Sequence, residues 1–236
     1  MENTVFPPIY VINFQDESRK ENMIHRFDSF GISLNFVPSV FTGDNRLDAV
    51  QGDKRIWSIM LQHLDSIRDF YVNTTADQCI VCEDDIFISK HFARDLPHVI
   101  DYFDYLKLDV LLLGYLLPYK LQQDDNLILV LNSGKDEVTD PVYSFKHYTD
   151  DLWGSQMYLI SRKHAKYLLD AYTVEWSLQN LHLPYSPDWI LTKVGNRAML
   201  YPMLAVEEGN TKTEDCGQNR FHQNCFLANY DADIYF

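Results

Sequence analysis

The feature that most limits how this chain can fold is the alternation of short apolar runs with amphipathic segments in its first half. The run IYVINF (9–14) is followed by a segment in which Met23 and Phe27 recur at helical spacing, and then by LNFVPSVF (34–41). A strand, a helix and a second strand in this order are typical of parallel sheets with crossover helices. The first part of the chain therefore favours an α/β fold.

The same alternation continues toward the middle of the chain. Residues 54–71 hold apolar side chains at helical spacing, and Asp53 is the predicted cap of that helix. A third strand is expected in QCIVCEDD (78–85), and the continuous apolar run DVLLLGYLL (109–117) favours a strand buried on both faces. Residues 118–150 are rich in turn-forming pairs, which predicts a loop-and-hairpin excursion.

Further strands and helices are predicted after this excursion. Residues 156–161 favour a strand, and Ser161 is placed to cap the helix that follows, with Arg162 on the helix surface. Pro187 stands at a favoured early position of another helix. A last strand is expected over 199–208.

Length and composition favour one packed domain. The chain has 236 residues, of which 46% are hydrophobic, enough to form a substantial core. We expect a single α/β domain over residues 1–236, with a central, mostly parallel sheet flanked by helices. Residues 209–236 are expected to form a polar C-terminal tail.

The charge of the chain limits its partners. A formal net charge of −14 argues against binding to a nucleic-acid backbone, which requires a basic surface. The apolar runs are too short for a transmembrane segment, and no stretch has the pattern of a signal peptide. We therefore expect a cytoplasmic protein.

The four cysteines give little evidence of a zinc site. Cys79 and Cys82 form one CxxC inside a predicted strand, which favours buried thiols over metal ligands. Whether Cys216 and Cys225 form a disulfide stays open at this point.

Three consecutive acids, Glu83, Asp84 and Asp85, directly follow the apolar part of the third predicted strand. Ligands of open α/β sheets bind at the carboxyl ends of the strands. Alternation along a strand places Glu83 and Asp85 on one face and Asp84 on the other. Two carboxylates on one face suit a hard cation such as Mn²⁺ or Mg²⁺, whereas the alternative is a solvated acidic loop.

With these elements in order, the chain resembles glycosyltransferase family 25, which includes bacterial lipooligosaccharide galactosyltransferases and collagen hydroxylysine galactosyltransferases. The resemblance is carried by IYVINFQDESRKENM, CIVCEDDIFI, DLWGSQMYLISRKHAKYLL, and SPDWILTK followed by YPMLAVEE. The chain departs from the family in QGDKRIWSIMLQH, where Gly52 and His63 match the family's G-E-x-G-C-x-x-S-H stretch but its Cys and its Ser-His pair are absent. The acceptor and the sugar therefore stay open.

The resemblance implies a GT-A-like fold and a divalent metal. It also implies inverting transfer of galactose from UDP-galactose to a hydroxyl group of a glycan or protein. Two alternatives remain: the same fold with another donor, such as UDP-glucose or a deoxysugar nucleotide, and a catalytically inactive sugar-binding module. A metal-dependent phosphohydrolase would need further clustered His and Asp ligands, and the sequence offers no convincing set.

The resemblance also assigns candidate metal ligands. Asp85 is the expected direct ligand of Mn²⁺ or Mg²⁺, with Glu83 and Asp84 in ligand, ribose or water contacts. A further ligand from the C-terminal region is expected to be His222, for which the alternative is an ordinary surface histidine.

Four residues are candidates for contacts with the nucleotide sugar. Asn13 is expected to bond the base or ribose, and Arg19 the phosphates, unless Arg19 is simply solvated. Trp153 is a candidate to stack on a sugar face, with core packing as the alternative. Gly154 would let the backbone approach the substrate.

Inverting transfer requires a general base that deprotonates the acceptor hydroxyl. Asp188, in SPDW, is the residue that matches the family. Asp150 and Asp151 are the alternative bases. The competing role for Asp188 is a carboxylate that stabilises a helix N-terminus.

Overall fold

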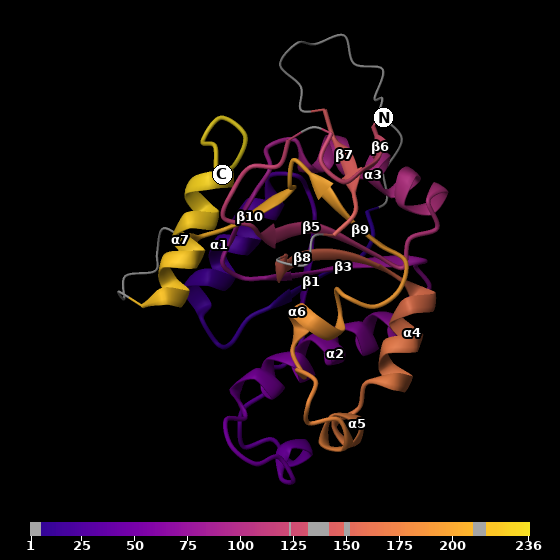
Figure 1. Cartoon of the computed structure of the whole chain (residues 1–236), viewed down its shortest axis with the longest axis vertical. Helices are drawn as coiled ribbons and strands as arrows, with labels where there is room; N and C mark the ends of the chain where they lie inside the picture. Colours follow the sequence, from indigo (N-terminus) through magenta and orange to yellow (C-terminus); the bar gives the residue numbers. More distant parts are fainter. Residues whose placement is uncertain (1–5, 123, 132–141, 149–151, 210–215) are drawn as a thin grey trace.

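An eight-stranded sheet forms the centre of the computed structural model, with the strand order β2-β1-β3-β8-β5-β9-β7-β6 (Figure 1). The structure describes residues 6–122, 124–131, 142–148, 152–209 and 216–236. β7 and β8 run opposite to the other six strands, so the predicted α/β fold with a mostly parallel sheet is confirmed. The strands are β1 (Ile9–Ile12), β2 (Leu34–Phe36), β3 (Gln78–Glu83), β5 (Val110–Leu116), β6 (Leu127–Val130), β7 (Ser144–Lys146), β8 (Trp153–Ser161) and β9 (Arg197–Tyr201).

Helices cover both faces of this sheet because its central strands are apolar on both sides. Every residue of β1 and β5 is buried. One core contains side chains of α2, α4 and α6, which lie below the strands in Figure 1, and a second core contains side chains of α1 and α3. The helices are α1 (Glu17–Asp28), α2 (Arg55–Asn73), α3 (Phe92–Tyr105), α4 (Arg162–Ala171), α5 (Val174–Gln179) and α6 (Pro187–Ile190), with a short 3-10 helix η1 (Asn45–Leu47).

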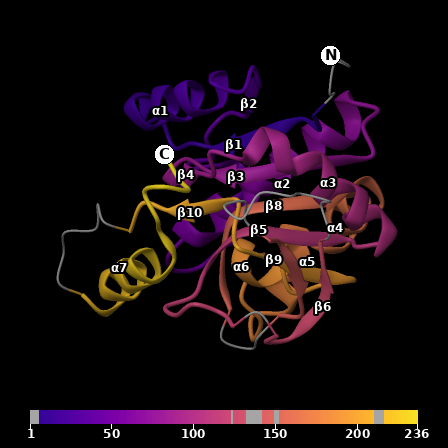
Figure 2. The same cartoon turned by 90° about the horizontal axis from the view of Figure 1, so that it is seen from above.

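The C-terminal part differs from the sequence-based prediction. The single strand expected over 199–208 is two strands: β9 ends at Tyr201, before the cis peptide bond to Pro202, and β10 (Ala205–Glu207) follows. β10 pairs with β4 (Ile86–Ile88) in a two-stranded sheet. The expected polar tail contains a helix, α7 (Gly217–Asn229), which lies beside β10 in Figure 2.

The excursion over 118–150 extends the central sheet. Its two described strands, β6 and β7, pair with each other, and β7 pairs with β9. The segment therefore adds an edge to the sheet.

The predictions for Ser161 and Arg162 had different outcomes. Ser161 caps α4 as predicted, since its Oγ accepts a hydrogen bond from the backbone N–H of His164 at 3.2 Å. Arg162 is not a surface side chain. Its guanidinium donates hydrogen bonds to backbone carbonyls at the end of α2, among them those of Tyr71 and Thr74, both at 2.8 Å. α2 lacked an evident C-terminal cap in its own sequence, and a residue far along the chain supplies one.

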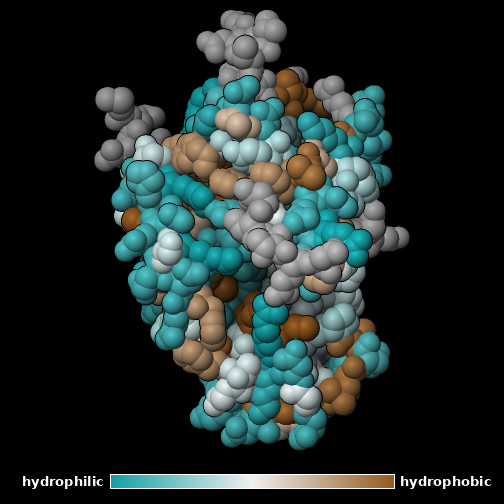
Figure 3. Space-filling model, turned by 90° about the vertical axis from the view of Figure 1, so that its left-hand side faces the viewer, coloured by the Kyte–Doolittle hydropathy of each residue, from teal (hydrophilic) through white to brown (hydrophobic). Residues whose placement is uncertain are grey.

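No helix in the described part of the chain is long and apolar enough to cross a membrane. The side of the molecule shown in Figure 3 is mainly hydrophilic, and its apolar side chains form small separate groups.

Candidate active site

The three acids at the end of β3 point to two different places. β3 ends at Glu83, and residues 84–85 form a bend before β4. Glu83 faces His63, whereas Asp84 and Asp85 both lie close to Arg19. The expectation that Glu83 and Asp85 share a face was wrong, because strand alternation stops where the strand stops.

The first group, here called the arginine cluster, consists of Asn13, Arg19, Asp84 and Asp85. The amide of Asn13 donates to Asp84 Oδ2 at 2.7 Å, and Arg19 Nη1 donates to Asp84 Oδ1 at 3.1 Å. Asp85 Oδ2 lies 3.5 Å from the same Arg19 nitrogen. Burial raises the pKa of Asp84, although Arg19 and Asn13 partly oppose this by stabilising its charge. The structure thus brings together residues that follow β1 and β3 and one residue of the first turn of α1.

The second group, here called the Asp188 cluster, consists of His63, Glu83, Ser155, Tyr158 and Asp188. His63 Nε2 lies 3.3 Å from Glu83 Oε1, and its Nδ1 lies 3.0 Å from the hydroxyl of Tyr158. The hydroxyl of Ser155 lies 3.5 Å from Glu83 Oε1 and 3.4 Å from Asp188 Oδ1. Side chains from α2, β3, β8 and α6 therefore meet at one end of the sheet.

The environment of Asp188 favours a proton-accepting carboxyl group. Burial raises its pKa, and the nearby negative charge of Glu83 raises it further. His63, the hydrogen bond from Ser155 and His222 partly oppose the shift. A carboxyl group with a raised pKa is a stronger base once ionised, as general-base catalysis requires.

His222 lies in α7 and not in a surface loop. Its Nδ1 is 2.6 Å from Glu207 Oε2, and both side chains are largely buried. This Glu207–His222 pair is joined to the acidic bend through the backbone, because the N–H of Glu208 donates to the carbonyl of Asp85 at 2.7 Å. Arg26 holds Glu208 in turn, with Nη2 2.6 Å from Glu208 Oε1.

The start of β8 supplies the other predicted residues. Trp153 is 46% exposed, so it is not a core residue, and Lys193 Nζ lies 4.7 Å from its ring centroid. Gly154 has φ +96°, and a Cβ there would collide with the side chain of Gln156. Glycine at 154 is therefore explained by packing within the protein. Asp150 and Asp151 lie outside the described residues.

The predicted metal ligands do not gather at one point. Across the described ranges, no three His, Cys, Asp or Glu side chains are grouped as ligands of one cation. Mg²⁺ is usually held by one or two carboxylates together with substrate phosphates, not by a cage made of protein alone. The carboxylate of Asp85, beside the phosphate candidate Arg19, fits that mode of binding. The set of Asp85, Glu83 and His222 stays a prediction.

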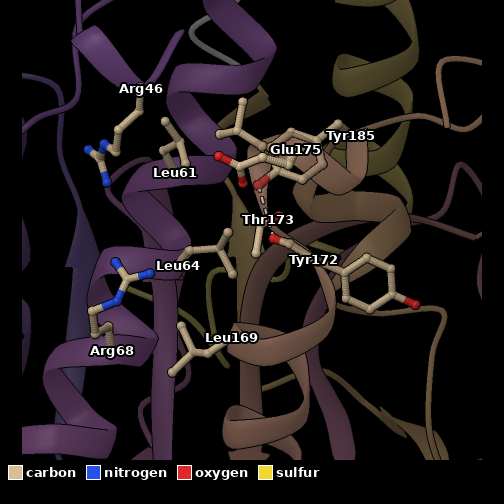
Figure 4. A pocket seen from close by; sticks show the side chains of 10 residues that line it. Arg46, Leu61, Leu64, Arg68, Leu169, Tyr172, Thr173, Glu175 and Tyr185 are labelled. Atoms are coloured by element: carbon tan, nitrogen blue, oxygen red, sulfur yellow. Dashed lines mark hydrogen bonds between the residues drawn. The ribbon is translucent and has the colours of Figure 1, made fainter. Parts of the chain in front are cut away.

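A separate cavity of about 260 Å³ lies between α2 and the α4–α5 segment. Figure 4 shows Arg46 and Arg68 on one side of it and Glu175 and Tyr185 on the other. None of the predicted site residues lines this cavity. Its floor is apolar and includes Leu61, Leu64 and Leu169.

Ser155, Tyr158 and Glu207 were not predicted as site residues. Ser155 and Tyr158 lie in β8, which begins three residues earlier than the strand predicted over 156–161, so Ser155 was not expected at a strand end. Glu207 had no signal in the sequence, since it appears only as an acid in a strand.

Comparisons with known proteins give one family match. Residues 69–182 match the family described as glycosyltransferase family 25 (LPS biosynthesis protein), a range that includes Glu83–Asp85 and Trp153–Tyr158. No curated protein sequence matches the chain.

Two solved structures are similar in part. A protein assigned as glucose-1-phosphate thymidylyltransferase, from Bacillus anthracis, is 12% identical with a TM-score of 0.36. The match covers 81% of this chain and 65% of the thymidylyltransferase chain. The chain thus spans just under two thirds of that protein. A mannose-1-phosphate geranyltransferase from Thermus thermophilus is 9% identical with a TM-score of 0.36. The match covers 82% of this chain and 72% of the geranyltransferase chain. The family match therefore concerns residues 69–182, and these two structures carry no argument about function.

Proposed function

We propose that this protein is an inverting glycosyltransferase that moves a hexose, with galactose as the first candidate, from a UDP-sugar to a hydroxyl group of a glycan or protein. The observation that carries the proposal is the partly buried carboxyl group of Asp188 with its raised pKa, 3.4 Å from the hydroxyl of Ser155 beside the acids of β3. Asp188 follows the matched range 69–182 in the chain, and its neighbours Glu83 and Ser155 belong to that range.

On the acceptor side, Asp188 is the proposed general base. An acceptor hydroxyl within hydrogen-bond distance of its carboxylate would lose its proton as the oxygen attacks the anomeric carbon. Partial burial raises the pKa of this carboxyl group, which makes the carboxylate a stronger base.

On the donor side, the arginine cluster is the proposed nucleotide-diphosphate site. Asn13 is fixed by Asp84 and offers amide contacts to the base or ribose, and the half-exposed Arg19 can turn toward phosphate oxygens. A Mn²⁺ or Mg²⁺ ion held by Asp85 would neutralise the charge of the departing diphosphate. Nδ1 of His222 is bonded to Glu207, so Nε2 is the nitrogen proposed to reach the same ion or phosphate.

The exposed ring of Trp153 is the proposed platform for a sugar. The C–H face of a pyranose ring packs on an indole, and Lys193 covers part of that ring in this structure. Trp153 and Ser155 are two residues apart at the start of β8, and Ser155 contacts Asp188, so a sugar stacked on Trp153 is proposed to lie near that carboxylate.

Two alternatives share the same site. Another nucleotide sugar, such as UDP-glucose or a deoxysugar donor, changes only the pocket around the sugar. An inactive sugar-binding module would keep the acids without turnover. Release of UDP separates these possibilities, because only a transferase or hydrolase produces it.

Removal of the Asp85 carboxylate is expected to reduce UDP release at least about tenfold, and EDTA is expected to do the same to the wild type, because both remove the proposed cation. The measurement is UDP release from a panel of UDP-sugars with Mn²⁺, comparing wild type with Asp85→Ala. Asp28→Ala, an exposed acid at the end of α1, is the control and is expected to behave as wild type. If no UDP-sugar is turned over although UDP binds tightly, the enzyme proposal is wrong.

Arg19→Gln is expected to weaken UDP binding about tenfold or more. The change removes a cation from the phosphates and leaves Asp84 and Asp85 to repel them. Isothermal titration with UDP measures the effect. Lys20→Gln is the matched control, since Lys20 is the next residue of α1 and pairs with Glu17. Equal affinities for wild type and Arg19→Gln would remove Arg19 from the nucleotide site.

A further inference from the structure

A continuous set of contacts leads from a buried tyrosine to Asp188. It runs from Tyr158 to His63, from His63 to Glu83, and from Glu83 through Ser155 to Asp188, over distances of 3.0, 3.3, 3.5 and 3.4 Å. The two serine contacts are long for O–H···O hydrogen bonds, as is common before substrate tightens a catalytic site. Tyr158 and His63 are 95 positions apart in the chain, so only the tertiary fold brings them into contact.

The donors in this set can be assigned by counting protons. A carboxylate can only accept, so we assign the N–H of His63 to Nε2, facing Glu83; in the neutral imidazole Nδ1 is then an acceptor, and the hydroxyl of Tyr158 donates to it. His63 has no exposed surface and its ring stacks on Tyr158, which fixes its orientation. Glu83 is thereby held in place from the α2 side.

Ser155 stands between two carboxylates with a single hydroxyl proton. Its Oγ lies almost equally far from Glu83 Oε1 and Asp188 Oδ1, and it can donate to only one of them at a time. With Glu83 already receiving the N–H of His63, the proton of Ser155 is available to orient Asp188. Bending of the chain at 84–85 separates Glu83 from Asp85, so Glu83 lies on the acceptor side of the site.

We propose that Ser155, Glu83, His63 and Tyr158 are positioning residues that hold the carboxylate of Asp188 in the direction from which it takes the acceptor proton. The proposal rests on the proposed function, since it assigns these residues to the base of that reaction. It places Glu83 with the base and leaves Asp85 as the carboxylate for the cation. None of the four contacts substrate directly.

A double-mutant cycle between Ser155 and Asp188 tests the proposal. Ser155→Ala is expected to lower kcat about 10- to 100-fold with the KM for the UDP-sugar changed less than about twofold, and Ser155→Thr is expected to recover most of the rate because it retains a hydroxyl. In an Asp188→Asn background, Ser155→Ala is expected to cause no further loss, because its effect passes through Asp188. Equal losses in the two backgrounds would overturn the proposal.

Tyr158→Phe gives a second, structurally conservative arm. It keeps the buried ring and removes only the hydroxyl, so it is expected to lower kcat severalfold in the wild type and not at all in Asp188→Asn. A crystal structure of Ser155→Ala in which Asp188 keeps its rotamer would also overturn the proposal. Failure of the positioning proposal can be told apart from failure of the proposed function. A wild type that turns over no UDP-sugar contradicts both. An active wild type whose variants show additive losses contradicts only the positioning role.

Discussion

Replacement of Asp188 by asparagine is expected to lower the rate of sugar transfer by about 10²–10⁴-fold, because the amide has nearly the same shape but cannot accept the acceptor proton. Ser155 can still donate to the asparagine oxygen, so the side chain keeps its place. UDP binding is expected to be unchanged, since the arginine cluster is formed by other residues. Initial rates of UDP release and titration with UDP measure the two effects.

The same carboxyl group sets the expected pH dependence. Asp188 works as a base only when ionised, and burial together with the charge of Glu83 raises its pKa. The rate of the wild type is therefore expected to fall on the acid side at a pH above the value of about 4 typical of an ordinary aspartate. A profile of kcat/KM against pH checks this, and an acid limb at the ordinary aspartate value would contradict the assignment.

Stability should respond in the opposite direction to activity. A carboxyl group with a higher pKa in the folded than in the unfolded protein lowers stability once the pH rises above its unfolded pKa, and the loss is complete above its folded pKa. Asp188→Asn removes this cost, so its Tm at pH 7 is expected to exceed that of the wild type, and the difference should vanish as the pH falls below both values. A lower Tm at pH 7 would show that Asp188 stabilises the fold, as a helix N-terminal carboxylate would.

The largest effect on stability is expected at Arg162. Its guanidinium satisfies carbonyls at the end of α2, including those of Phe70, Tyr71, Thr74 and Ala76, and lies 4.7 Å from the ring centroid of Phe70. Arg162→Met would remove the arginine donors from the carbonyls of Tyr71, Thr74 and Ala76, at a cost of about 2–4 kcal/mol, whereas Phe70 keeps the hydrogen bonds from Thr74. Thermal unfolding is expected to shift downward by about 5–10 °C.

Two controls define what Arg162 contributes. Arg162→Lys keeps the charge but loses the planar fork of donors, so its Tm is expected to lie between those of wild type and Arg162→Met. Lys166→Met, four residues along α4, removes only an exposed pair with Asp170 and is expected to leave the Tm unchanged. If Arg162→Met unfolds at the wild-type temperature, water satisfies these carbonyls equally well.

Sequence patterns were sufficient for the strands that are buried on both faces. β1, β3, β5 and β8 are runs of apolar, β-favouring side chains, and such runs have few alternative conformations. The short strand β4 and the helix α7 were not predicted, and β10 was expected as part of one longer strand. Each is short or mixed in polarity and depends on its neighbours: β4 and β10 on pairing with each other, and α7 on contact with β10.

The amino-acid sequence by itself determined that this is an α/β protein and that three acids stand where a strand ends. It also singled out Asp188 through a resemblance. Only the tertiary structure decided what each acid does: Asp84 and Asp85 turn to Arg19, and Glu83 turns to His63 and Ser155. The physical reason is that side-chain direction follows the strand repeat only within the strand. Beyond Glu83, the bend and the packing of α1, α2 and β8 choose the partners, and these contacts join residues far apart in the chain.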